Sequence, residues 1–291
     1  MATLATAAGA RPTLLAVLAH PDDESFGTGG TLARYSWMGA AVHLVCATGG
    51  EEGSFDPEHL EGYASITERR QAELACAARA LGLASLTMLG YRDSGMAGAP
   101  SNQHPEALAA QPHAAVVARV VGIIRRLRPH VVITFDPIGG YRHPDHIAIQ
   151  RATVAAFHAA GDPGRLPAEG EPWRPQKLYF QTFPRAFLRA AVRLMPLFGQ
   201  DPRRFGRNKD VDLASLAEVD FPIHARVDYL PVVEARLAAA RCHASQGGER
   251  FASGPLTWVG RLLGGAETYM RAFPEAPPGL RERDLFEGVR W

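Results

Sequence analysis

The sequence of 291 residues has little of three features that would assign it to a specialised class of protein. It has three cysteines, Cys46, Cys76 and Cys242, and this sparse, odd set argues against a disulfide framework and for a reducing compartment. No apolar run is long enough to span a bilayer, and the N-terminal segment does not fit the pattern of a signal peptide. We therefore expect a cytoplasmic protein without a membrane span.

An excess of charge of one sign is also lacking. The 31 Lys and Arg residues nearly balance the 30 Asp and Glu residues, which leaves a formal net charge of +1. Proteins that bind nucleic acid usually carry a basic excess, so we expect no nucleic-acid partner. Hydrophobic residues make up 46% of the chain, which is enough for a sizeable core. The expected partner is a small molecule, and self-association into a homo-oligomer stays open.

Short apolar runs alternate with helical patterns along the first half of the chain. We expect strands at 13–19, 41–47, 86–89, 130–135 and 177–183, and helices at 28–39, 65–82, 112–128, 144–160 and 229–243. Continuous apolar strands that alternate with helices indicate an α/β protein, a mostly parallel sheet with helices on both faces. We expect a single domain over residues 1–291, with a core at about 12–250 and a helical excursion at about 184–210. The proline-rich stretch 163–175 fits either a loop or a domain boundary.

Polar segments directly follow four of the predicted strands. They are His20 to Glu24, "TGGEEG" (48–53), "YRDSGM" (91–96) and "DPIGGYRHPDH" (136–146). Because ligands bind beyond the carboxyl ends of the strands in a parallel sheet, we expect these four segments to share one site. Polar loops in general would explain the glycines and some of the acids, but not two His-Pro-Asp sequences on two different loops.

Two of these segments carry residues with the spacing of metal ligands. His20 and Asp23 are three residues apart, and so are His143 and His146. Two imidazoles and one carboxylate suit a catalytic zinc ion that keeps a position for water. The same set suits the Fe(II) of a non-haem oxygenase, but those sites usually sit in barrels, which the strand–helix alternation argues against.

These polar segments and several flanking motifs resemble those of a known family. The motifs "AHPDDE" (19–24), "TGGEEG" (48–53), "YRDSGM" (91–96), "RPHVVITFDPIGGYRHPDH" (128–146) and "CHASQ" (242–246) are similar to those of the LmbE-like, or GlcNAc-phosphatidylinositol-type (PIG-L), zinc de-N-acetylases. The resemblance covers about residues 12 to 250 and is greatest to the deacetylase and the conjugate amidase of the mycothiol pathway. It implies a Rossmann-like fold, an active site at the carboxyl ends of the strands, one Zn²⁺ per chain, and removal of the N-acetyl group from a small N-acetylglucosaminide.

The resemblance also implies roles for residues at the matching positions, as metal ligands, as catalytic residues and as sugar-binding residues. The metal ligands would be His20, Asp23 and His146, and the catalytic residues Asp22, His143 and Tyr141. The sugar-binding residues would be Arg70 and Asp93. Asp22 would be the general base and Tyr141 would help to bind the oxyanion. Whether Asp22 or His143 protonates the leaving amine stays open.

Three residues allow a second interpretation from the sequence alone. Arg70 lies on an apolar helix face and could instead pair with Glu51 or Asp93. We expect Glu24 to have a supporting role, and His243 to hydrogen-bond a helix end rather than to line the cleft.

Two residues near the expected substrate mouth depart from the family pattern. Ser54 follows "GEEG" where the mycothiol-pathway deacetylase has an acidic residue, and Arg142 occupies a position where a small residue is usual. We therefore expect an aglycone other than inositol, and expect the segments 51–56, 91–104 and 184–210 to border the mouth. The alternatives are an amidase that cleaves larger N-acyl groups such as thiol conjugates and, more remotely, a non-catalytic sugar-binding protein.

Overall fold

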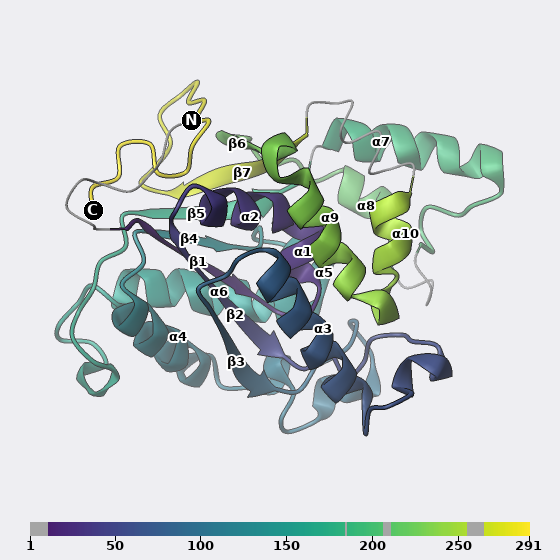
Figure 1. The fold of residues 1–291 in the computed structure, drawn as a ribbon, viewed down its shortest axis with the longest axis horizontal. Coiled ribbons are helices and arrows are strands. Elements are labelled where there is room, and N and C mark those ends of the chain that lie inside the picture. The colour runs from purple at the N-terminus through teal and green to yellow at the C-terminus, as the bar shows by residue number, and fades with distance from the viewer. Residues whose placement is uncertain (1–10, 184, 206–210, 255–264) are drawn as a thin grey trace.

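The computed structural model describes residues 11–183, 185–205, 211–254 and 265–291 (Figure 1). Its centre is a seven-stranded sheet with the strand order β3-β2-β1-β4-β5-β7-β6. The strands are β1 Thr13–Leu18, β2 Ala41–Thr48, β3 Ser85–Tyr91, β4 Val131–Thr134, β5 Lys177–Thr182, β6 Ala225–Asp228 and β7 Ala266–Phe273. β1 to β5 are mutually parallel, whereas β7 is antiparallel to both β5 and β6. The mostly parallel α/β sheet that the sequence predicts is confirmed.

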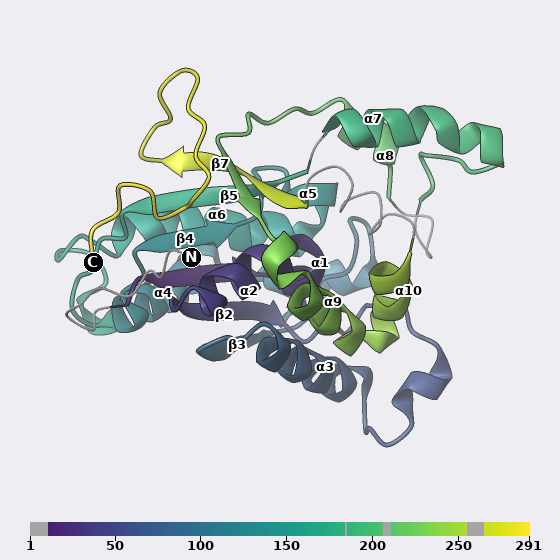
Figure 2. The same cartoon turned by 45° about the horizontal axis from the view of Figure 1, so that its top comes forward.

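Helices cover both faces of this sheet (Figures 1 and 2). α2 Gly29–Trp37, α3 Ile66–Ala80 and α9 Val233–Cys242 pack together on one face, and α4 His113–Leu127 and α6 Pro144–Ala159 pack on the other. The shorter helices are α1 Asp23–Gly27, α5 Gly139–Arg142, α7 Arg185–Leu194, α8 Leu213–Ala217 and α10 Gly248–Ser253. None of the helices in the described ranges is long and apolar enough to cross a membrane.

The apolar runs of the sequence explain the first strands. Leu14 to Ala19 are completely buried, as a central strand covered on both faces requires. The helix starts also follow sequence signals. Ser65 caps α3 by accepting a hydrogen bond from the Glu68 backbone N–H, 3.1 Å away, and Pro144 opens α6 at its first turn. These local signals place the elements that carry the polar segments.

The sequence did not predict β6 and β7. β6 has only four residues, which alternate between buried and exposed, and β7 includes Glu267 and Arg271. Neither strand therefore shows the continuous apolar run of a central parallel strand. β7 lies beyond residue 250 yet sits between β5 and β6, so the sheet extends past the core that the sequence predicts.

The predicted excursion at 184–210 is helical in α7, which projects away from the sheet in Figure 1. Residues 184 and 206–210 lie outside the described residues. That the whole chain forms one domain stays a prediction.

A disulfide bond joins Cys76 on α3 to Cys242 at the end of α9, with a Cα–Cα distance of 5.7 Å. Cys46 is a buried free thiol. The expectation that the cysteines form no disulfide is therefore wrong. The two partners are 166 residues apart and meet because α3 packs against α9, a contact that the spacing of cysteines cannot indicate.

We expect the unreduced protein, unfolded in denaturant, to expose one thiol to an alkylating reagent, and three thiols after reduction. Replacing both Cys76 and Cys242 by Ser should lower the free energy of unfolding by about 2–4 kcal/mol, because the bond closes a long loop. Mass spectrometry and denaturant titration would measure the two effects, with Cys46→Ala as the control that leaves the bond intact. Three reactive thiols before reduction would contradict the pairing.

Candidate active site

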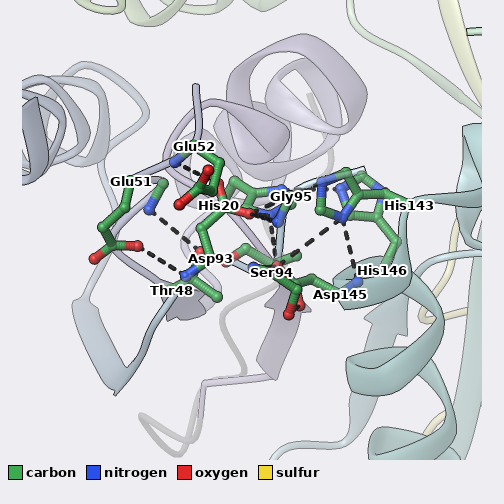
Figure 3. Close-up of polar contacts among 12 residues, drawn as sticks. His20, Thr48, Glu51, Glu52, Asp93, Ser94, Gly95, His143, Asp145 and His146 are labelled. Carbon is green, nitrogen blue, oxygen red and sulfur yellow. Dashed lines mark hydrogen bonds and ion pairs between the residues drawn. The ribbon is translucent and has the colours of Figure 1, made fainter. Parts of the chain in front are cut away.

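The four polar segments meet at the carboxyl edge of the parallel strands, as the sequence predicts (Figure 3). They border a cleft of about 390 Å³. The predicted site residues that line it are His20, Asp22, Arg70, Asp93, Tyr141 and His143. Segments 51–56 and 91–104 contribute Ser54 and Met96 to its wall, whereas the described part of 184–210 contributes no residue to it.

Three side chains from two loops bring their donor atoms to one point. His20 Nδ1 lies 3.1 Å from His146 Nε2, and the Asp23 carboxylate lies 3.6 Å from His20 Nδ1 and 3.4 Å from His146 Nε2. Two ring nitrogens bound to one tetrahedral zinc are about 3.3 Å apart. His143 adds a further nitrogen, since donor atoms of His20, His143 and His146 all lie within 4.8 Å of one another. The spacing and chemistry of this donor set fit a divalent metal ion.

The second ring nitrogen of His20 contacts two further carboxylates. His20 Nε2 is 3.2 Å from Asp145 Oδ2 and 3.4 Å from Asp93 Oδ1. Asp145 is fully buried and is itself held by the backbone N–H of Ser94, 2.8 Å away, and by the Ser94 hydroxyl. Histidines that bind metals commonly donate their other N–H to a carboxylate, which fixes the orientation of the ring.

The cluster has an excess of negative charge. Burial lowers the pKa of His20, but the neighbouring Asp93, Asp145 and Asp23 outweigh it and raise that pKa well above its ordinary value. Burial raises the pKa of Asp23, but His146 and His20 outweigh it, so the pKa of Asp23 is lowered. A buried group of carboxylates needs compensating positive charge, which a divalent cation would supply.

Asp22 lies beside this cluster and is paired with Arg70. Arg70 Nη2 is 3.0 Å from Asp22 Oδ2, and the same guanidinium donates to the carbonyls of Pro21 at 2.8 Å and Gly50 at 2.6 Å. Burial raises the pKa of Asp22 to about 6, against the opposing effect of Arg70. The suggested Arg70 partners, Glu51 and Asp93, are wrong, and the pairing that the structure shows is with Asp22.

Asp93 points inward rather than into open solvent. Its carboxylate accepts from the backbone N–H of Gly95 at 2.8 Å and of Glu52 at 3.3 Å, in addition to its contact with His20. Burial raises the pKa of Asp93, but His20, the hydrogen bond from the Gly95 N–H and His143 outweigh it, so its pKa is lowered. Asp93 therefore borders the cleft while its carboxylate orients the histidines.

His143 begins α6 as its N-cap. Its Nδ1 accepts from the backbone N–H of Asp145 at 3.2 Å, so in the neutral ring the proton is on Nε2. Burial, together with His20 and His146, lowers the pKa of His143 to about 3. His143 thus presents an N–H donor towards the cluster. Tyr141 lies on the outer side, with its ring centroid 4.8 Å from that of His146, and is partly exposed.

Three residues of the site were missed or misread from the sequence. Asp145 was not singled out, although it lies between two predicted site residues in "HPDH". Gln246, in the quoted motif "CHASQ", lines the cleft. His243 does not bond a helix end through its side chain, because its Nε2 is 2.6 Å from Glu24 Oε1.

The comparisons with known proteins agree with this geometry. The model of the PIG-L family, GlcNAc-PI de-N-acetylase, matches residues 15–157. The chain is 39% identical to the 1D-myo-inositol 2-acetamido-2-deoxy-alpha-D-glucopyranoside deacetylase of Thermomonospora curvata, over 95% of this chain and 96% of that protein. It is 40% identical to the enzyme of the same name from Geodermatophilus obscurus, over 95% of this chain and 97% of that protein.

A solved structure supports the fold. The N,N'-diacetylchitobiose deacetylase of Pyrococcus horikoshii superposes with a TM-score of 0.61 at 21% identity, covering 92% of this chain and 87% of that one. Relatives of about 40% identity over nearly the whole chain show common membership of a family. The chain therefore belongs to the PIG-L family of de-N-acetylases and is an N-deacetylase, a hydrolase of amide bonds.

Proposed function

We propose that this N-deacetylase acts on an N-acetylglucosaminide linked to inositol, with one zinc ion held by His20, Asp23 and His146. The observation that carries the proposal is the convergence of two imidazole nitrogens and a carboxylate next to Asp22, where Asp22 and His20 line the cleft. The substrate class is supported by the names of relatives that match 95% of the chain.

The chain's own residues would divide the chemistry between them. A bound zinc ion supplies Lewis acidity and lowers the pKa of its water to about 7. Asp22 takes the proton of the attacking water as the water oxygen bonds to the acetyl carbon. His143 donates its Nε2–H to the oxyanion, and Tyr141 closes the outer side of that position. When the carbon–nitrogen bond breaks, Asp22 returns the proton to the amine, which gives acetate and a free amino sugar.

The aglycone is the point at which sequence and relatives disagree. Ser54 suggested an aglycone other than inositol, yet the relatives are named as enzymes that act on the inositol-linked sugar. A carboxylate is still present on the same wall, because Glu52 lines the cleft and its Oε1 is 2.9 Å from Arg92 Nη2. We therefore favour inositol, with Glu52 as the acidic residue of the mouth.

Neither the iron oxygenase nor the amidase for larger acyl groups, two alternatives drawn from the sequence, is supported by the fold or the relatives. The parallel sheet is not the barrel expected of an iron oxygenase, and the relatives named above are deacetylases rather than amidases for larger acyl groups. A cytoplasmic location and self-association stay predictions. The sparse cysteines no longer argue for a reducing, cytoplasmic compartment, because two of them form a disulfide bond. Analytical ultracentrifugation would test self-association.

We expect the wild-type enzyme to release acetate from the inositol-linked sugar with a kcat/KM at least 10-fold above that for N-acetylglucosamine alone. Asp22→Asn should lower kcat by about 10²–10⁴-fold, the usual contribution of a general base, and serves as the inactive control. Ser54→Glu should change the ratio little. A preference for another aglycone, with a gain for the inositol compound in Ser54→Glu, would restore the hypothesis drawn from Ser54.

We expect about one zinc ion per chain in wild-type protein and a large loss of metal in His146→Ala, because a two-ligand site binds zinc far more weakly. Elemental analysis after dialysis would measure the stoichiometry alongside activity. His43→Ala is the matched control, since His43 lies on β2 and bonds Ser85 at 2.7 Å. Full retention of metal and activity in His146→Ala would rule out this ligand set.

We expect Arg70→Lys to lower kcat by about 10-fold or more and to change KM by less than about 3-fold. A lysine cannot reach Asp22 and two carbonyls at once, so the support of Asp22 is lost. Steady-state kinetics separate this from the sugar-binding role that the family resemblance implies. If KM rose strongly while kcat stayed unchanged, the sugar-binding role would be correct.

A further inference from the structure

A buried carboxylate–imidazole pair lies directly behind the site and has no part in the chemistry described above. Glu24 on α1 is 1% exposed and His243, next to the end of α9, is 0% exposed. His243 Nε2 and Glu24 Oε1 are 2.6 Å apart, although the two residues are 219 positions apart in the chain. Burying such an ionisable pair carries a desolvation cost that only good geometry and further hydrogen bonds offset.

The Glu24 carboxylate holds the backbone of Asp22. Its Oε2 accepts a hydrogen bond from the Asp22 N–H at 3.0 Å. Asp22 has φ 131° and ψ −27°, a conformation that non-glycine residues rarely adopt. Such a backbone costs on the order of 1–3 kcal/mol and persists only when its surroundings hold it. The Asp22 carbonyl is fixed as well, by the N–H groups of Ser25 and Phe26, both at 3.0 Å.

His243 in turn holds the Glu24 carboxylate, together with the Ser25 hydroxyl at 2.5 Å from Oε1. The segment that carries His243 is fixed on both of its sides to α3. Cys242 is bonded to Cys76, and Ser245 donates its N–H and its hydroxyl to Glu73 at 2.9 and 2.7 Å. His243 therefore offers a rigid reference point for Glu24.

We propose that Glu24 and His243 are positioning residues for Asp22. His243 fixes the Glu24 carboxylate, and Glu24 keeps Asp22 in the positive-φ conformation that directs its side chain to Arg70 and the cleft. Arg70 is on α3 and His243 follows α9, so both supports of Asp22 come from one pair of packed helices. This inference rests on the proposed role of Asp22 as the general base.

The first test is Glu24→Gln, which keeps the size of the side chain but places an amide where two acceptor oxygens are needed. We expect kcat to fall about 10–100-fold, as for other residues that orient a catalytic group, with KM within about 2-fold and the metal content unchanged. His243→Asn, which leaves the Glu24–Asp22 contact in place, should lower kcat by a smaller factor of about 3–10. A folded His243→Asn enzyme with kcat within 2-fold of wild type would overturn the role of His243.

Glu282→Gln is the matched control for loss of a buried carboxylate. Glu282 is 4% exposed and pairs with Lys177 at 2.7 Å, at the start of β5 and so at the opposite edge of the sheet from the cleft. We expect this variant to unfold at a lower denaturant concentration while kcat per folded chain is unchanged. An equal loss of kcat in Glu282→Gln and Glu24→Gln would show that the effect of Glu24 is one of general stability, and would overturn the inference.

A double-mutant cycle distinguishes the inference from the function on which it rests. If Glu24 acts through Asp22, adding Glu24→Gln to Asp22→Asn lowers the residual turnover no further. Losses that multiply, with Asp22→Asn itself strongly impaired, would overturn the positioning role and leave the proposed function intact. Near wild-type turnover in Asp22→Asn would instead remove Asp22 as the base, and the inference with it.

Discussion

The burial of several carboxylates at one edge of the sheet is the constraint on which the site depends. A buried carboxylate costs several kcal/mol unless hydrogen bonds or opposite charges compensate it. Each acid here has such compensation: Asp145 from Ser94, Asp93 from backbone N–H groups, and Asp22 from Arg70. The glycine-rich loops after the strands supply the N–H donors. The histidines and a bound cation would supply the remaining positive charge. This explains why metal-binding histidines and acidic residues occur together on these loops.

The sequence predicted much of the fold because its signals are local. The five parallel strands are largely apolar, most completely in β1 and β4, and their parallel arrangement brings the polar segments that follow the first four to one edge. The same rule is enough to bring His20, Asp23, His143 and His146 together in one site. The two strands that the sequence did not predict have no clear local signal, since β6 has only four residues and β6 and β7 are antiparallel strands with charged residues among the apolar ones.

The contacts that the sequence did not predict join residues far apart in the chain. Arg70 reaches Asp22 over 48 positions, and His243 reaches Glu24 over 219. The Cys76–Cys242 bond has the same origin, the packing of α3 against α9. An arginine on an apolar helix face predicts either a carboxylate partner or a place in the site, and only the packing of the helices decides which acid it meets.

The ion pairs at the inner side of the cleft are more deeply buried than the pair on its outer wall. On the inner side, Arg70 pairs with the partly buried Asp22, and behind it His243 pairs with the buried Glu24, so that loss of one partner leaves a poorly compensated charge. On the outer wall, the Arg92–Glu52 pair is about one third exposed on both sides, and pairs of that kind contribute little to stability. Substitutions on the wall therefore cost little folding free energy, whereas substitutions on the inner side are costly. A change of aglycone can thus arise on the wall, at positions such as Ser54, without disturbing the groups that cleave the amide.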